Sequence, residues 1–270
     1  MRFLRSLFYY VGSAFRIMFY FKRWPSVLFS LFFQDKERTK IVTLRRPRLE
    51  FIARGGMDIW SIKETLLDGF YTDYGTPIKD GWHVLDVGAG IGDFSLQAAY
   101  GNPNTTVYAY EPFPESYQIL TKNIKLNGFE NIQPVNAALW RDKGTLQLDT
   151  SSGEPLQIMS MDTSDEEDIP EVIKVEAISL TGVFDQHETQ HFDIVKLDCE
   201  GAEYEILMNA SRVLFKKIDR IIMEYHDIDE NYHHEKLALF LEDMGYAVFC
   251  YDNFVHKDIG YLFAERKDLI

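Results

Sequence analysis

Short apolar runs alternate with amphipathic stretches from Gly81 to the end of the chain. Strand-like runs and helix-like runs in alternation predict βαβ units and a parallel sheet. The last two strand-like runs follow one another directly and predict an antiparallel edge. The pattern indicates a Rossmann-like α/β sheet of about seven strands, mostly parallel, with an antiparallel C-terminal strand. The strand-like runs are 83–88, 106–111, 131–139, 192–198, 218–226, 247–252 and 260–266.

The segment between 140 and 180 is less regular. Two strand-like runs, 144–150 and 172–180, predict a hairpin that leaves the main sheet, and the acidic stretch 161–171 between them predicts a solvated loop.

The first 33 residues are rich in Phe, Tyr and Leu, and their pattern predicts amphipathic helices broken near Pro25. The longest uncharged stretches have 10 and 11 residues, whereas a membrane-spanning helix needs about 20. Residues 35–50 are charged and predict a linker or an irregular extended stretch. We therefore divide the chain into an N-terminal helical and linker segment, 1–49, and a main domain, 50–270.

Charge is distributed unevenly along the chain. Residues 1–50 hold 11 Lys/Arg against 3 Asp/Glu, and the remainder holds 17 against 39, a net charge of −22. A body this acidic argues against nucleic acid as the main partner, because phosphate binding needs a basic face. The basic, aromatic head has two interpretations: it packs on the body or on a second subunit, or it lies on a membrane surface.

Two cysteines without metal-type spacing, Cys199 and Cys250, indicate no disulfide framework and a reducing, cytoplasmic setting.

The strongest local motif is VLDVGAGIGDFS, residues 84–95. Gly88, Ala89, Gly90 and Gly92 follow a strand end, where glycine allows a sharp turn and close approach of a ligand. The spacing is G-x-G-x-G, and it lacks the last small residue of the dinucleotide fingerprint. S-adenosylmethionine has no pyrophosphate and fits this turn, with Asp86 near its ammonium group.

Two further strand ends fit a nucleoside. Glu111 ends the second strand, 19 residues after Gly92, and a carboxylate there can accept hydrogen bonds from both ribose hydroxyls. Pro112 then ends the strand. Asn136 and Ala137 close the third strand, where the amide would meet the purine edge and the small residue would leave room for its face. The alternative for Asn136 is a side chain that caps a turn.

The segment DIVKLDCEGAEYEIL, 193–207, places Asp198, Glu200 and Glu203 at a strand-to-helix turn. Helix-dipole effects explain one or two carboxylates there but not Asp198, which lies at the sheet edge where ligands bind. His226 ends a neighbouring strand, and Glu224 shares its face. Asp198, Glu200 and His226 are therefore the candidates for a general base or for orienting the acceptor. A divalent metal on Asp198 and Glu200 is the alternative; because no complete ligand set is apparent, we predict none.

Together these motifs resemble the FkbM-like methyltransferases. The segments that carry the resemblance are 51–71, 84–95, 108–128, 135–139 and 196–207, and it extends over about residues 50–265. Arg54, Asp58 and Tyr71 stand in places that match the family. The resemblance implies a class I methyltransferase sheet, S-adenosyl-L-methionine as cofactor, and O-methylation of a hydroxyl on a sugar, glycolipid, polyketide or similar small molecule.

Substrate contacts are expected from Arg54, Asp58, Glu203 and Glu224. Two other functions stay open. One is a non-catalytic binding or scaffold protein with the same fold, and the other is a nicotinamide-dependent oxidoreductase. The unfilled third fingerprint position and the D-x-E-G-x-E element count against the oxidoreductase. The sequence leaves the acceptor and the oligomeric state open, including a homo-oligomer.

Overall fold

The computed structural model describes residues 2–32, 39–149, 157–159, 172–187, 191–253 and 255–270. The acidic stretch 161–171, predicted as a loop, lies outside the described residues.

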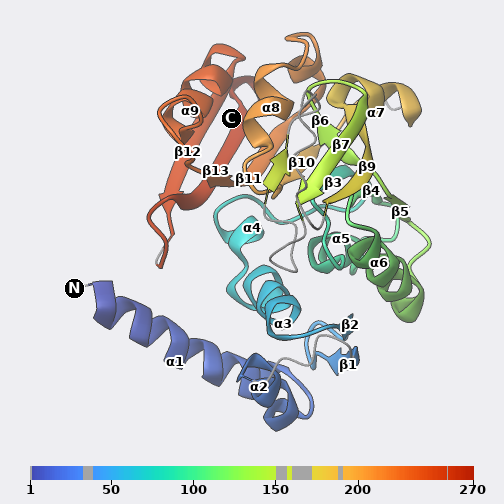
Figure 1. The fold of residues 1–270 in the computed structure, drawn as a ribbon, viewed down its shortest axis with the longest axis vertical. Helices are drawn as coiled ribbons and strands as arrows, with labels where there is room; N and C mark the ends of the chain where they lie inside the picture. The colour runs from blue at the N-terminus through green and yellow to red at the C-terminus, as the bar shows by residue number, and fades with distance from the viewer. Residues whose placement is uncertain (1, 33–38, 150–156, 160–171, 188–190, 254) are drawn as a thin grey trace.

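A seven-stranded sheet in the order β12-β13-β11-β10-β3-β4-β5 forms the centre of the molecule (Figure 1). The neighbours from β11 to β5 pair in parallel, and β13 is antiparallel to both β11 and β12. The predicted fold class, including the antiparallel C-terminal strand, is confirmed. The strands are β3 (His83–Val87), β4 (Thr106–Tyr110), β5 (Ile132–Val135), β10 (Ile194–Leu197), β11 (Arg220–His226), β12 (Tyr246–Asp252) and β13 (Ile259–Arg266).

The central strands are buried on both faces, so that their residues alternate between two apolar clusters. Val84, Ile194 and Ile222 belong to one cluster, and Leu85 and Val195 belong to the other. The crossover helices that cover these faces are α5 (Asp93–Ala99), α6 (Pro114–Asn127), α7 (Leu180–Gln186), α8 (Glu203–Met208) and α9 (His234–Asp243).

The apolar run 131–139 is not one strand. It divides into β5 and β6 (Ala138–Trp140), and β6 begins a second sheet of order β6-β9-β7-β8. Here β7 (Gly144–Asp149) pairs antiparallel with β9 (Val172–Ser179) and with β8 (Gln157–Met159), which confirms the predicted excursion from the main sheet.

The N-terminal residues form α1 (Arg2–Tyr20) and α2 (Trp24–Phe32). The break falls at 21–23, where Arg23 has a φ of 51°, and Pro25 lies in the first turn of α2, where the lack of an N–H has no cost. Residues predicted as a linker instead contribute β1 (Lys40–Thr43), which pairs with β2 (Glu50–Ala53). In Figure 1 these elements lie together on the side of α3 (Gly56–Lys63), far from α8 and α9.

A buried ammonium group joins α1 to the body. The Lys63 side chain is fully buried; its Nζ donates to Tyr9 Oη at 2.8 Å and pairs with Asp68. Asp68 ends a π-helical turn, η1 (Glu64–Asp68), and also pairs with Arg16 of α1. The short helix α4 (Phe70–Asp73) follows. Within the described residues, no helix is long and apolar enough to cross a membrane.

Candidate active site

The glycine turn after β3 is held against both neighbouring strands. The backbone N–H groups of Gly88 and Ala89 donate to Tyr110 O at 3.0 and 2.9 Å. Gly88 has a φ of 72°, and a Cβ there would lie 1.8 Å from Asp198 O. Only glycine fits, because the backbones after β3 and β10 are in contact at this point.

A cavity of about 260 Å³ opens beside this turn, at the carboxyl ends of the parallel strands. It lies where ligands bind in open α/β sheets. A Cβ built on Gly90 would meet no atom within 4 Å, so that position leaves the cavity open. The predicted site residues that line it are Arg54, Asp58, Gly88, Gly90, Glu111, Pro112, Ala137, Asp198 and Glu200.

Glu111 lies on the wall of this cavity. Its carboxylate accepts the N–H of Gly90 at 2.7 Å and that of Phe113 at 2.8 Å. Burial raises the pKa of Glu111 to about 7, although both backbone hydrogen bonds lower it. The side chain is thus fixed with its carboxylate directed at the glycine turn.

Asn136 caps the strand ends instead of lining the cavity. Its Nδ2 donates to Glu111 O at 2.8 Å and Pro112 O at 3.0 Å. These bonds turn the chain between β5 and β6. The neighbouring Ala137 lines the cavity, and Leu139 and Leu148 extend that apolar wall.

Asp86 lies beneath the cavity and does not line it. It is fully buried, accepts a hydrogen bond from Ser95 Oγ at 2.6 Å, and lies 3.1 Å from Lys196 Nζ. Lys196 also donates to Gly88 O at 2.8 Å and lies 3.8 Å from Asp198. The carboxylates Asp86 and Asp198 outweigh burial and raise the pKa of Lys196, which stays charged.

Sequence reasoning missed Lys196, although a charged residue inside the apolar run FDIVKLD is a visible signal. It lies two residues before Asp198 and therefore on the same strand face.

Asp198 and Glu200 form the other side of the cavity. Tyr71 Oη donates to Asp198 Oδ2 at 2.7 Å. Glu200 has a φ of 53°, which is uncommon for a residue other than glycine and costs energy that the surrounding structure must supply. The Glu200 side chain lines the cavity from this position.

His226 connects Glu200 to a buried carboxylate. Its Nε2 lies 3.4 Å from Glu200 Oε2, and its Nδ1 lies 3.6 Å from Glu203 Oε1. Glu203 is fully buried and also accepts the Cys199 N–H at 2.9 Å. Burial lowers the pKa of His226, but Glu203, Glu200 and Asp198 outweigh it and raise that pKa to about 10. Glu224, on the same strand, has a pKa raised well above its usual value by burial and by Asp198.

The predicted site residues outside the cavity lining are Asp86, Ala89, Gly92, Asn136, Glu203, Glu224 and His226. Arg54 and Asp58 line it together and pair with each other at 2.9 Å. The buried Asp93, at the start of α5, accepts a hydrogen bond from Ser61 Oγ of α3 at 2.9 Å and joins the segment before the sheet to the glycine turn.

Comparison with known families identifies the chain. The family model for the methyltransferase FkbM domain matches residues 86–248, which contain the glycine turn, Glu111 and the acidic turn at 198–203. The chain belongs to the FkbM methyltransferase family. Its cofactor is S-adenosyl-L-methionine.

Relatives of this FkbM-family methyltransferase match most of its length. The 31-O-demethyl-FK506 methyltransferase FkbM of Streptomyces tacrolimicus is 24% identical over 221 residues, 70% of this chain and 83% of the relative. Methyltransferase sdnD of Sordaria araneosa is 24% identical over 233 residues, 76% of this chain and 88% of the relative. The crystal structure of methyltransferase FkbM from Methylobacillus flagellatus KT matches with a TM-score of 0.47 and 12% identity, over 76% of this chain and 53% of that chain.

Proposed function

We propose that this FkbM-family methyltransferase O-methylates a hydroxyl group of a sugar, glycolipid, polyketide or similar small molecule. The observation that supports the proposal is the cavity beside the glycine turn, with Glu111 on one side and Asp198 and Glu200 on the other. The FkbM relative is named for methylating an oxygen of FK506.

The residues present fit the cofactor. Gly90 provides an open backbone surface, Gly88 allows the close approach of the two strand ends, Glu111 accepts from the ribose, and Ala137, Leu139 and Leu148 provide an apolar wall for the adenine. Asp86 contributes through Lys196 by fixing the strand ends beneath the cavity. When bound, the cofactor supplies an electrophilic methyl group, so the protein's task is to position the acceptor.

Glu200 is the group that takes the proton of the acceptor hydroxyl. It lines the cavity, whereas His226 lies behind it and orients it from 3.4 Å. Asp198, held by Tyr71, borders both the cofactor and the acceptor. Arg54 and Asp58 line the acceptor side, and Glu224, outside the lining, lies on the strand that ends in His226.

Kinetics separate this chemistry from binding. Alanine at Asp198, Glu200 or His226 is expected to lower turnover by about 10²–10⁴-fold, the usual contribution of a general base and its support, with a smaller effect on cofactor affinity. Rates within twofold of wild type for all three variants would mean that positioning alone carries the reaction.

The proposal assigns no metal ion to this site. The ammonium group of Lys196 lies 3.8 Å from Asp198 and already supplies a cation there. A chelator is expected to leave the rate unchanged, and loss of activity restored by a divalent cation would refute this assignment.

Two binding experiments test the function itself. Calorimetry is expected to show binding of S-adenosylmethionine and its demethylated product and none of NAD. A screen with labelled cofactor against sugar, lipid and polyketide alcohols then distinguishes an enzyme from a binding protein, which would hold the cofactor without transferring its methyl group. Tight NAD binding without either sulfur nucleoside would refute the proposal.

We also propose that α1 places the enzyme on an anionic membrane surface, where a lipid-linked acceptor resides. Phe8, Phe15 and Phe19 are 73%, 55% and 73% exposed, and their spacing puts them on one face of the helix with Val11. Residues 1–33 carry five Lys/Arg and no acidic residue. Aromatic side chains with neighbouring cations are the composition of a helix that lies in a lipid interface.

Flotation with anionic liposomes tests the membrane proposal. The full chain is expected to float at low salt, and chains lacking residues 1–33 or carrying Phe15→Glu and Phe19→Glu are expected to stay in the soluble fraction. If the full chain also stays soluble, the head belongs to the body or to a subunit contact in a homo-oligomer.

Thiol labelling would check the reducing, cytoplasmic setting, in which Cys199 and Cys250, both free in the structure, stay reduced.

A further inference from the structure

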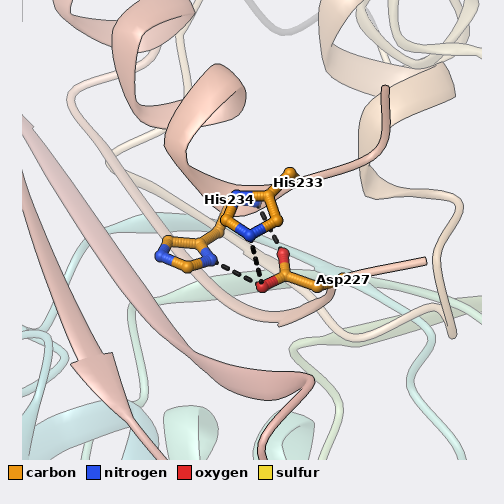
Figure 2. Close-up of side chains that lie close together, drawn as sticks. All are labelled: Asp227, His233 and His234. Atoms are coloured by element: carbon orange, nitrogen blue, oxygen red, sulfur yellow. Dashed lines mark hydrogen bonds and ion pairs between the residues drawn. The ribbon is translucent and has the colours of Figure 1, made fainter. Parts of the chain in front are cut away.

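A second cluster of charged side chains lies where β11 passes into α9, separate from the cavity lining. Asp227 follows the last residue of β11, and His233 and His234 begin α9. Figure 2 shows both imidazole rings directed at one carboxylate. His234 Nδ1 lies 2.7 Å and His233 Nε2 lies 3.5 Å from the same oxygen, Asp227 Oδ2.

Surrounding contacts fix the orientation of each group. The other carboxylate oxygen, Asp227 Oδ1, accepts hydrogen bonds from the backbone N–H of His234 at 2.7 Å and from the Tyr204 hydroxyl at 3.3 Å. The oxygen Oδ2 is therefore left to the two imidazole rings. The His234 ring stacks on Tyr225 at 4.3 Å and on His233 at 4.6 Å. Stacking and hydrogen bonds to the carboxylate hold both rings in place. At a metal site, contacts of this kind orient the ligands.

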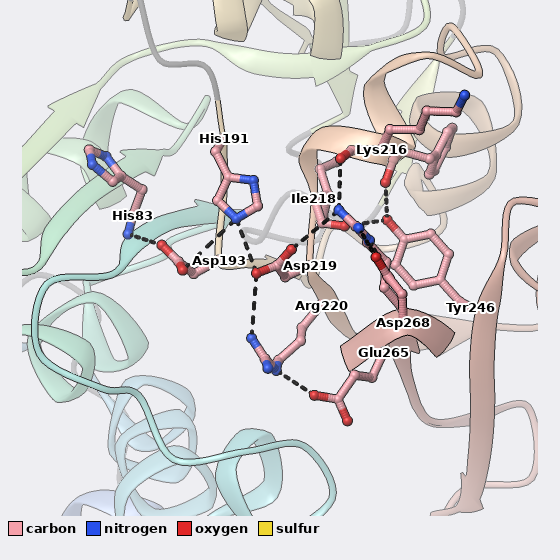
Figure 3. Close-up of polar contacts among 12 residues, drawn as sticks. His83, His191, Asp193, Lys216, Ile218, Asp219, Arg220, Tyr246, Glu265 and Asp268 are labelled. Atoms are coloured by element: carbon pink, nitrogen blue, oxygen red, sulfur yellow. Dashed lines mark hydrogen bonds and ion pairs between the residues drawn. The ribbon is translucent and has the colours of Figure 1, made fainter. Parts of the chain in front are cut away.

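Two other His–carboxylate clusters in the described residues differ because a permanent cation accompanies them. Asp219 lies 3.1 Å from His191 but also pairs with Arg220 and Arg266. Figure 3 shows Asp219 between His191 and Arg220. The cluster of Asp198, Glu200 and His226 has Lys196 beside it. For Asp227, the ion pairs among the described residues involve His233 and His234 alone, so no guanidinium or ammonium group competes with a metal ion.

We infer that Asp227, His233 and His234 bind a divalent transition-metal ion of the zinc class. Two imidazoles and one carboxylate are ligands that Zn²⁺ and Co²⁺ favour, with water completing the shell. Tetrahedral ligands at about 2.0–2.1 Å from the metal lie about 3.3 Å from one another. The 3.5 Å pair already fits this value, and the 2.7 Å pair has to open by about 0.6 Å. In the structure His233 Nδ1 accepts the backbone N–H of Glu235 at 3.4 Å. Binding a metal through Nε2 places the ring proton on Nδ1, so this contact at the start of α9 is given up when the ion binds.

The ion secures the connection 227–233 and takes no part in methyl transfer. Ile228 of this connection packs on Gly201, where a Cβ would lie 2.6 Å from the Ile228 side chain. Gly201 follows Glu200 in the acidic turn. A metal at Asp227 therefore stabilises the segment that supports that turn.

Titration of chelator-treated full-length protein with Zn²⁺ and Co²⁺ tests the inference, by calorimetry and by the visible absorption of bound Co²⁺. One ion per chain is expected. His233→Gln, on the surface, and Asp227→Asn, which keeps the acceptor for α9, are expected to weaken binding about 100-fold or more. Tyr204→Phe, which removes a supporting contact, is expected to weaken it about tenfold. The exposed His256→Gln serves as the matched control and is expected to bind as wild type.

Three results would overturn the inference. They are no saturable binding tighter than about 100 µM, wild-type affinity in His233→Gln and Asp227→Asn, and loss of binding in His226→Gln alone. The last outcome would place the ion in the acceptor site. Because cofactor binding and methyl transfer are measured separately, failure of the metal site leaves the proposed function untouched.

Discussion

Replacement of Glu111 by alanine tests the cofactor site at its most constrained side chain. The wild-type carboxylate accepts the Gly90 and Phe113 N–H groups at 2.7 and 2.8 Å in a buried setting, and in the proposed complex it would also accept from the ribose hydroxyls. Leaving buried partners of such a group unsatisfied costs about 1–3 kcal/mol. Since each 1.4 kcal/mol corresponds to a factor of ten, the dissociation constant for the demethylated cofactor is expected to rise about 5- to 150-fold.

The pH dependence of binding provides a second, sharper signature. Burial raises the pKa of Glu111 to about 7, and the ribose binds the carboxylate form, which can accept on both oxygens. Affinity is therefore expected to be full above pH 7 and to fall as the pH drops through 7, by up to about tenfold per unit. Glu111→Gln keeps the shape but has no titrating group, and both it and Glu111→Ala are expected to lose the pH step.

Calorimetry with the demethylated cofactor between about pH 5.5 and 8.5 measures both effects without turnover, over the range in which a group of pKa near 7 titrates. An unchanged dissociation constant in Glu111→Ala would remove this residue from the site. A wild-type affinity that stays flat across the range would refute the link between its ionisation and ribose binding.

Two further variants test the framework around the site. Gly88→Ala places a Cβ 1.8 Å from Asp198 O and is expected to abolish cofactor binding. The control Gly101→Ala, also at positive φ but in open space, is expected to bind the cofactor normally. Equal cofactor affinities in the two variants would contradict the close approach of the two strand ends. Lys63→Met removes a fully buried ammonium from Tyr9 and Asp68 and is expected to lower the free energy of unfolding by about 3–5 kcal/mol and to expose α1 to protease. A loss below about 1 kcal/mol in urea unfolding, or a loss equal to that of the exposed control Lys122→Met, would show that α1 is held by other contacts.

Much of the main sheet and of the cofactor side could be predicted from the sequence. Local pattern was sufficient there, because apolar runs that end in Asp86, Glu111 and Asp198 are strand ends of a parallel sheet. Helix α6 begins at Pro114 and ends at Asn127, and both ends are marked in the sequence, by the proline and by the glycine at 128.

The missed features depend on contacts between distant residues. The run 131–139 divides because the Asn136 amide binds backbone carbonyls 24 and 25 residues away. Asp86 lies beneath the cavity because Lys196, 110 positions later, engages it. The many charged residues in this part of the chain obscured the β1–β2 hairpin in the sequence. The period-two pattern of a strand is nevertheless present, because the buried side chains of Val42 and Leu44, and of Phe51 and Ala53, alternate with more exposed ones.

If α1 lies on a membrane surface, as proposed above, the buried Lys63 also fixes the orientation of the catalytic domain relative to that surface. A helix joined to the catalytic domain by a flexible linker would allow the domain to rotate freely relative to the membrane. Because the buried Lys63 ammonium holds α1 against the domain, the domain keeps one orientation relative to α1. On a bilayer, that orientation would present the same rim of the molecule to the lipid plane throughout every encounter. A lipid-linked acceptor would then be met by diffusion in the plane of the membrane at one fixed orientation of the enzyme, and changes at Lys63 would alter how often the two meet.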